Sequence, residues 1–294
     1  MKPKNLKTKI FLDSGDPVET KEIINLLGFL DGQTTNPTLI SKNPYAKERF
    51  EKGEEFSKQE IYDFYKKVVT DISKFIPDGS ISIEVYADAA TPADEMLKQA
   101  REMFSWVPNA HIKFPTTKEG LKAAEQAIKE GLRINMTLCF SQEQAAAVYA
   151  ATQGAKRGQV FVSPFIGRLD DRGENGMSLI KNILQMYKMG DGHVEVLTAS
   201  VRNLSHFLYA LSLDSDIITV PYKVLKEWRE RKMPMPGTSK DFSYDPGKLK
   251  PIPYHEINLN LSWQKYNIWH ELTDKGIERF SEDWNNLIVE KKCC

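Results

Sequence analysis

The stretch Asn109-Ala110-His111-Ile112-Lys113-Phe114-Pro115 puts a lysine near the end of an apolar run. Side chains alternate between the faces of a strand, so His111 and Lys113 are expected on the same face of a half-buried strand. Ile112 and Phe114 are expected to pack on the other face. Burial destabilises an ammonium ion and frees the amine to attack a carbonyl, as a Schiff-base lysine does. The alternative is a strand-end lysine whose ammonium reaches solvent.

Seven other runs have the composition of short strands, and helical patterns separate them. The eight predicted strands are residues 9–13, 29–35, 80–86, 109–115, 132–139, 159–163, 194–199 and 216–220. Because strands that alternate with helices form parallel sheets, eight of them predict an α/β fold of the (β/α)8 TIM-barrel type. An inserted helical segment is predicted after the second strand, between residues 43 and 76, where apolar residues recur at helical spacing.

The composition changes after Lys232. Residues 233–255 hold five prolines and two glycines, which predicts an extended strap. Apolar and aromatic residues between 263 and 288 predict C-terminal helices that pack on the barrel or across its mouth. We therefore expect a catalytic barrel domain over residues 1–232 and a strap with a helical extension over residues 233–294.

Composition and charge exclude several classes of protein. The 294 residues include 40 basic and 40 acidic side chains, and this balance argues against a nucleic-acid partner while leaving room for a local anion site. No run reaches the roughly 18 apolar residues of a membrane helix, and the basic N-terminus lacks the apolar part of a signal peptide. Cys139, Cys293 and Cys294 make no disulfide framework, and the last two are expected in an exposed tail. A cytoplasmic location fits these features best.

Polar residues collect where the predicted strands end, the place where barrels of this kind carry their active sites. They provide one amine, two carboxylates, several amides and hydroxyls, and two arginines that could hold a phosphate with a serine. These residues are Asp13, Thr34, Asn36, Glu84, Lys113, Asn135, Thr137, Ser163, Arg168, Ser200 and Arg202. Each arginine taken alone could instead form a surface salt bridge. The five histidines show no metal-ligand spacing and no nucleotide-binding motif is present, so we expect a lysine reaction without metal or cofactor.

Six strings of residues, in this order, resemble the transaldolase family. They are Phe11-Leu12-Asp13, Thr34-Thr35-Asn36-Pro37-Thr38-Leu39-Ile40, Ile112-Lys113, Asn135-Met136-Thr137-Leu138, Ser163-Pro164-Phe165-Ile166-Gly167-Arg168 and Ala199-Ser200-Val201-Arg202-Asn203. The resemblance covers roughly residues 9–231. It implies a class I enzyme that transfers a dihydroxyacetone unit from sedoheptulose 7-phosphate or fructose 6-phosphate to glyceraldehyde 3-phosphate or erythrose 4-phosphate. Such a reaction belongs to the non-oxidative pentose phosphate pathway.

The resemblance also implies a role for each site residue. Lys113 would form the Schiff base, Asp13 would be the acid/base at the cleaved bond, and Glu84 with Thr137 would position a water. The dihydroxyacetone moiety would be bound by Asn36, Asn135 and Ser163, and the distal phosphate by Arg168, Ser200 and Arg202. Thr34 and Phe165 complete the expected substrate-binding set.

The same family contains small aldolases that release free dihydroxyacetone. In those enzymes a glutamine usually replaces the glutamate of the third strand and a tyrosine replaces the phenylalanine of the SPF string. Glu84 and Phe165 occupy these positions here and favour a transaldolase, whereas Phe114 and Pro115 after the lysine are closer to the small aldolases. A fructose 6-phosphate aldolase and a non-catalytic sugar-phosphate-binding barrel are the alternatives, and a homo-oligomer is left open.

Overall fold

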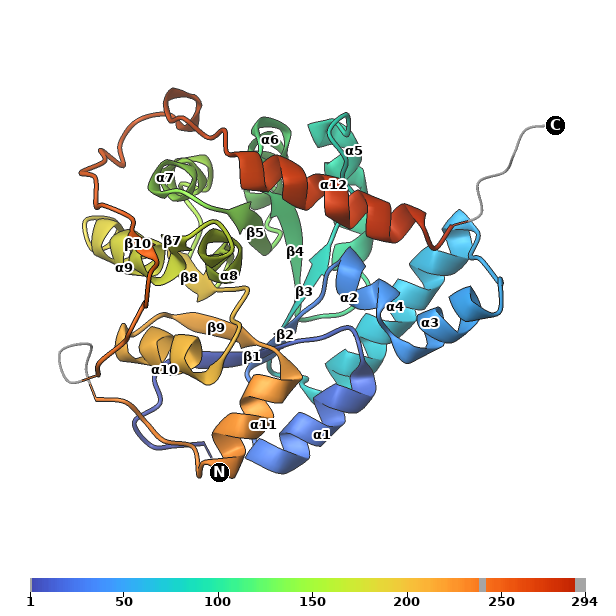
Figure 1. The fold of residues 1–294 in the computed structure, drawn as a ribbon. Coiled ribbons are helices and arrows are strands. Elements are labelled where there is room, and N and C mark those ends of the chain that lie inside the picture. The colour runs from blue at the N-terminus through green and yellow to red at the C-terminus, as the bar shows by residue number, and fades with distance from the viewer. Residues whose placement is uncertain (1, 238–241, 289–294) are drawn as a thin grey trace.

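The computed structural model describes residues 2–237 and 242–288. Eight parallel strands close into a barrel in chain order (Figure 1). They are β1 (Lys9–Asp13), β2 (Gly32–Thr34), β3 (Ser80–Glu84), β4 (Ala110–Pro115), β5 (Ile134–Cys139), β6 (Val160–Pro164), β8 (Val194–Thr198) and β9 (Ile217–Val220). The predicted (β/α)8 barrel is therefore confirmed, and each predicted strand overlaps an observed one.

Helices surround the barrel and connect its strands. They are α1 (Pro17–Leu27), α2 (Pro37–Ser41), α3 (Pro44–Glu51), α4 (Lys58–Phe75), α5 (Ala93–Phe104), α6 (Lys118–Lys129), α7 (Gln142–Ala151), α8 (Ile166–Asp170), α9 (Gly176–Tyr187), α10 (Leu204–Ser212) and α11 (Tyr222–Glu230). The inserted segment after the second strand is confirmed as α3 and α4. The short helix α8, which directly follows β6, was not predicted.

Strand β4 is buried along its whole length, so the expectation of a half-buried strand is wrong. Helices α5 and α6 pack against its outer face, and the barrel interior encloses the other. The predicted alternation nevertheless holds, because His111 and Lys113 both make their contacts with neighbouring strands inside the barrel. Lys113 lies toward the carboxyl end of the strand and His111 toward the amino end.

His111 closes the floor of the barrel as a neutral side chain. Its ring stacks on Phe161 at a centroid distance of 4.2 Å. Its Nδ1 lies 2.7 Å from the hydroxyl of Ser80 and its Nε2 lies 2.9 Å from the carbonyl oxygen of Gly158. Desolvation by burial lowers the pKa of His111 from 6.5 to about 3. The imidazole therefore acts as a packed, hydrogen-bonded ring at neutral pH.

The chain after α11 passes around the outside of the barrel before it returns to the mouth (Figure 1). It contains the short strand β10 (Lys250–Pro251), which pairs with β7 (Glu174–Asn175), and a 3₁₀ turn at Trp263–Lys265. The extended strap is confirmed for the residues described. Several helices were expected after the strap, but the described residues contain one α-helix there, α12 (Glu271–Asn285). Helix α12 packs against α2 and β5 at the carboxyl ends of the strands.

Two further features bear on the sequence analysis. No helix in the described ranges is long and apolar enough to cross a membrane. Cys139 is buried in β5, where desolvation raises the pKa of its thiol to about 12, while Cys293 and Cys294 lie outside the described residues. The division into domains at residues 232 and 233 stays a prediction.

The low pKa of His111 makes the stability of the fold depend on pH. Between pH 6.5 and about 3 the unfolded chain binds a proton at His111 that the folded chain does not, so the free energy of unfolding falls as the pH falls. In urea denaturation between pH 6 and 4, we expect the wild type to lose up to about 1.4 kcal/mol per pH unit more than His111→Gln. Equal slopes for the two proteins would contradict a neutral buried His111.

Candidate active site

A cavity of about 290 Å³ opens at the carboxyl ends of the barrel strands. Nine of the twelve predicted site residues line it, and the other three lie buried just beneath or beside it. The nine are Asp13, Thr34, Asn36, Lys113, Ser163, Phe165, Arg168, Ser200 and Arg202. Glu84, Asn135 and Thr137 are the buried three. Because the strands of a parallel barrel all end at one face, residues from seven strand ends meet in a single site.

Lys113 and Glu84 form a buried ion pair in the site. Their strands are in register at these two residues, and Nζ of Lys113 lies 2.7 Å from Oε2 of Glu84. The Lys113 ammonium also donates to the carbonyl oxygen of Thr35 at 3.1 Å. The apolar run in which Lys113 lies therefore does not give its amine apolar surroundings. Desolvation raises the pKa of Glu84, although the charge of Lys113 opposes the rise. Because its pKa is raised, the Glu84 carboxylate accepts a proton more readily than an exposed one.

Asp13 supplies the second carboxyl group, at the end of β1. The hydroxyl of Thr34 donates to its Oδ1 at 2.7 Å, and Thr34 in turn lies 2.5 Å from the hydroxyl of Thr219. Desolvation raises the pKa of Asp13, while Thr34 and the charge of Lys113 oppose the rise. Asp13 is thus a fixed carboxyl group that faces the cavity and is suited to exchanging a proton.

Small polar side chains link strands β3, β5 and β6 beside the lysine. Ser163 donates to Oδ1 of Asn135 at 2.6 Å, and Nδ2 of Asn135 donates to the hydroxyl of Ser82 at 3.0 Å. The Thr137 hydroxyl is fully buried and has no hydrogen-bond partner among the residues described. At Asn36, Oδ1 caps α2 by accepting from the amide of Leu39, so Nδ2 is the atom that can donate to a ligand.

Positive charge is concentrated at the outer end of the cavity, around Arg168. Burial lowers the pKa of Arg168 most, and the charges of Arg279 and Arg202 lower it further. An anion would relieve this repulsion, so the charge of the cluster suits an anion better than a metal cation. No group of three His, Cys, Asp or Glu side chains that could hold a metal ion occurs within residues 2–237 and 242–288.

The loop after β8 brings Ser200 and Arg202 to this end of the cavity. Ser200 has a φ of 60°, a left-handed conformation that is unusual outside glycine. A Cβ atom at Gly167 would lie only 2.2 Å from Nε of Arg202 and 2.5 Å from the carbonyl oxygen of Ser200. Glycine at this position therefore allows the loop to lie directly on α8. Arg202 also pairs with Asp171 at 2.7 Å, so the salt bridge that was the alternative for this arginine is present.

Ten residues of the cavity wall were not predicted from the sequence, and four of them come from helix α11, helix α12 or the end of α2. Lys42 and Lys223 add positive charge from the end of α2 and from α11, and Arg279 and Phe280 come from α12. The sequence left open whether the C-terminal extension packs on the side of the barrel or across its mouth. An amphipathic pattern shows which face of a helix is buried but does not show which surface it covers.

The comparison with known families agrees with this geometry. A family model described as transaldolase/fructose-6-phosphate aldolase matches residues 10–291. The chain belongs to this family. The match extends beyond residue 231, where the resemblance of the sequence strings ended, and so includes the strap and α12.

Curated members of the transaldolase/fructose-6-phosphate aldolase family are similar over nearly their whole length. A protein of Dehalococcoides mccartyi named probable transaldolase is 38% identical, with 95% of this chain and 99% of the relative covered. Probable transaldolases of Alkaliphilus metalliredigens and Methanococcus maripaludis are 34% and 36% identical. These alignments cover 95% and 94% of this chain and 99% and 97% of the two relatives.

The arginine cluster predicts that inorganic phosphate binds in the cavity. Arg168→Met should weaken phosphate binding at least about tenfold in isothermal titration, because it removes the most enclosed guanidinium of the site. Arg101→Met is the matched control, since Arg101 pairs with Glu130 on the exposed surface away from the cavity. Equal affinities of Arg168→Met and the wild type for phosphate would contradict this site.

Proposed function

We propose that this enzyme is a transaldolase that moves a dihydroxyacetone unit between sugar phosphates through a Schiff base on Lys113. The observation that carries the proposal is the buried pair of Lys113 and Glu84 beneath a cavity whose outer end is cationic. A ketose phosphate such as fructose 6-phosphate or sedoheptulose 7-phosphate would place its C2 carbonyl at the amine and its phosphate at the arginines. Family membership and the names of the relatives support this assignment.

The reaction begins when Lys113 becomes a neutral nucleophile. Glu84 lies 2.7 Å from the ammonium and has a raised pKa, so it can take the proton as the substrate enters. The amine adds to C2, and the resulting carbinolamine loses water to form an iminium ion. Thr137, whose hydroxyl has no hydrogen-bond partner in the described part of the chain, holds that water together with Glu84.

Cleavage of the C3–C4 bond follows from the iminium ion. The electron pair of this bond moves toward the iminium nitrogen and leaves an enamine on Lys113. Asp13 accepts the proton of the C4 hydroxyl, which becomes the carbonyl of the departing aldose phosphate. Thr34 orients Asp13 for this transfer through its hydrogen bond of 2.7 Å. General acid/base assistance of this kind contributes roughly 10²- to 10⁴-fold.

The remaining residues bind the substrate at its two ends. Asn36, Asn135 and Ser163 contact the dihydroxyacetone moiety, and Arg168, Ser200 and Arg202 hold the phosphate. Phe165 covers the space between these groups on the cavity wall. The enamine then adds to glyceraldehyde 3-phosphate or erythrose 4-phosphate, and hydrolysis by the water at Thr137 releases the new ketose. Such an exchange fits the non-oxidative pentose phosphate pathway in the cytoplasm.

Borohydride trapping tests the proposed lysine directly. Intact-mass spectrometry after reduction in the presence of fructose 6-phosphate should show an adduct of reduced dihydroxyacetone on the wild type and none on Lys113→Met. The variant should fold, because Glu84 has a raised pKa and can become neutral when its partner is removed. Phosphate-sugar binding without any adduct on the folded wild type would instead indicate a non-catalytic sugar-phosphate-binding barrel.

A second assay separates transfer from release. We expect turnover of fructose 6-phosphate to require an acceptor aldose phosphate, because Glu84 and Phe165 are the residues that favour transfer. Without the acceptor, free dihydroxyacetone should form at least about tenfold more slowly than the transfer product does with it. Rapid formation of free dihydroxyacetone without an acceptor would identify a fructose 6-phosphate aldolase.

A further inference from the structure

Strand β5 contains an extra residue directly after Thr137. In its pairing with β6, Met136 lies opposite Val162 and Cys139 lies opposite Pro164. Between these two pairs β5 advances by three residues and β6 by two. Leu138 absorbs the difference with a φ of 57°. This left-handed conformation is unfavourable for a leucine, so neighbouring contacts must hold it. A bulge of this kind changes where the side chains around it point.

The backbone around Thr137 is fixed on one side by the loop after β4. The carbonyl oxygen of Thr137 accepts from the amide of Thr116 at 2.9 Å and from its hydroxyl at 2.7 Å. These bonds fix the peptide group but leave the Thr137 hydroxyl without a partner among the described residues. The direction of that hydroxyl therefore depends on the conformation of the next residue, Leu138.

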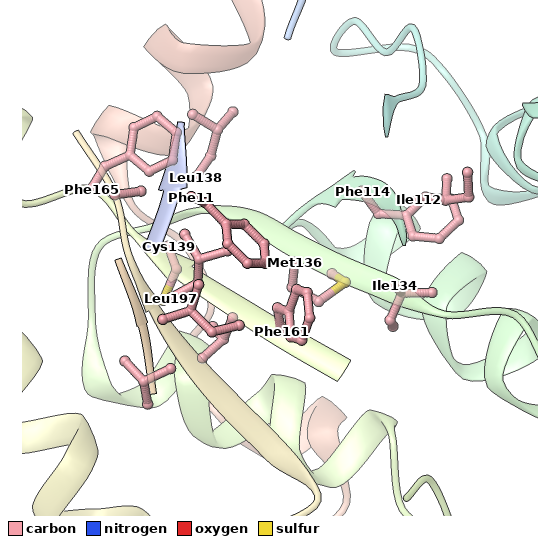
Figure 2. Close-up of a cluster of buried hydrophobic side chains, with 14 of the residues drawn as sticks. Phe11, Ile112, Phe114, Ile134, Met136, Leu138, Cys139, Phe161, Phe165 and Leu197 are labelled. Carbon is pink, nitrogen blue, oxygen red and sulfur yellow. The ribbon is translucent and has the colours of Figure 1, made fainter. Parts of the chain in front are cut away.

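Helix α12 holds Leu138 from the other side. The hydroxyl of Thr273 donates to the carbonyl oxygen of Leu138 at 3.0 Å, and Nε2 of the buried Gln144 donates to Thr273 at 2.8 Å. Gly276, one turn later, lies so close that a Cβ atom there would be 2.6 Å from Cδ2 of Leu138. In Figure 2 the Leu138 side chain lies at the end of the buried cluster near Phe165, away from Ile134.

A ring contact adds to the docking of α12 at this point. His270, the N-cap of α12, stacks on Phe140 with ring centroids 5.2 Å apart and planes at 20°. Phe140 packs edge to face on Phe165 of the cavity wall. The amino end of α12 is thus attached to the two residues that flank Cys139.

We propose that Thr273 is a positioning residue, which holds the Leu138 bulge so that the Thr137 hydroxyl faces the reacting lysine. This inference rests on the proposed function, because it assumes that Thr137 holds the water of the Schiff-base steps. Thr273 lies in the helical extension and touches no part of the cavity itself. Its direct bond to β5 is the one to Leu138, so Thr273 should alter the rate of turnover rather than the binding of substrate.

Replacement of the Thr273 hydroxyl tests the inference. Thr273→Val keeps the shape of the side chain but removes the bond to Leu138, and kcat should fall about tenfold while KM stays within about twofold. Thr273→Ser restores the donor and should return kcat to within about twofold of the wild type. Parallel losses in Thr273→Val and Thr273→Ser, or a change confined to KM, would overturn the inference.

A double-mutant cycle distinguishes positioning from simple loss of stability. If Thr273 acts through Thr137, Thr273→Val should change kcat by less than about twofold in a Thr137→Val background. Independent losses that multiply would show that Thr273 is only structural. An unchanged kcat in Thr137→Val alone would refute the proposed role of Thr137 and the inference with it. A loss in Thr137→Val but none in Thr273→Val would refute the inference alone.

A second variant covers the case in which Thr273→Val does not fold. Gly276→Ala favours the helical conformation of α12, yet its methyl group would displace the Leu138 side chain. We expect about a tenfold loss of kcat without a comparable change in KM. Gly276→Ala with wild-type kcat would contradict control of the site by the Leu138 bulge.

Discussion

The ion pair of Lys113 and Glu84 is the constraint on which the rest of the site depends. Both groups are nearly inaccessible to water, and a buried charge is tolerated only beside a partner. The pairing of β3 with β4 places the two residues side by side, so the register of the barrel determines the chemistry. In the proposed mechanism Glu84, whose pKa burial raises, is the group that accepts the proton of the amine.

The sequence predicts the barrel because each strand is a short apolar run between turn residues and helices. Helix starts depend on few neighbours, as at Thr117 and Ser141, whose side chains cap α6 and α7. The partner of Lys113 could not be predicted, because it depends on how two strands align. The short helix α8 was missed for a different reason, since five residues are too few to show a helical period.

The two ends of the cavity are built in different ways. Around Lys113 the side chains come from the strands themselves and are fixed by hydrogen bonds that join β3, β5 and β6. Around Arg168 they come from loops and helices, and close contacts such as that of Gly167 with Arg202 keep them together. The motif strings predicted that Arg168 and Arg202 lie at one site. The contribution of Arg279 could not be predicted in this way, because it depends on the path that the strap takes to α12. The roles assigned to the individual site residues stay predictions.

The strap attaches α12 to the barrel at a series of points along the outer helices. Tyr244 stacks on Tyr209 of α10, Asn182 of α9 donates to the carbonyl oxygen of Ile252, and Gln142 of α7 exchanges hydrogen bonds with His255. Because α12 follows all eight strands, a ribosome makes it only after the whole barrel has been synthesised. One wall of the cavity is therefore supplied by a helix that is synthesised after every strand of the barrel.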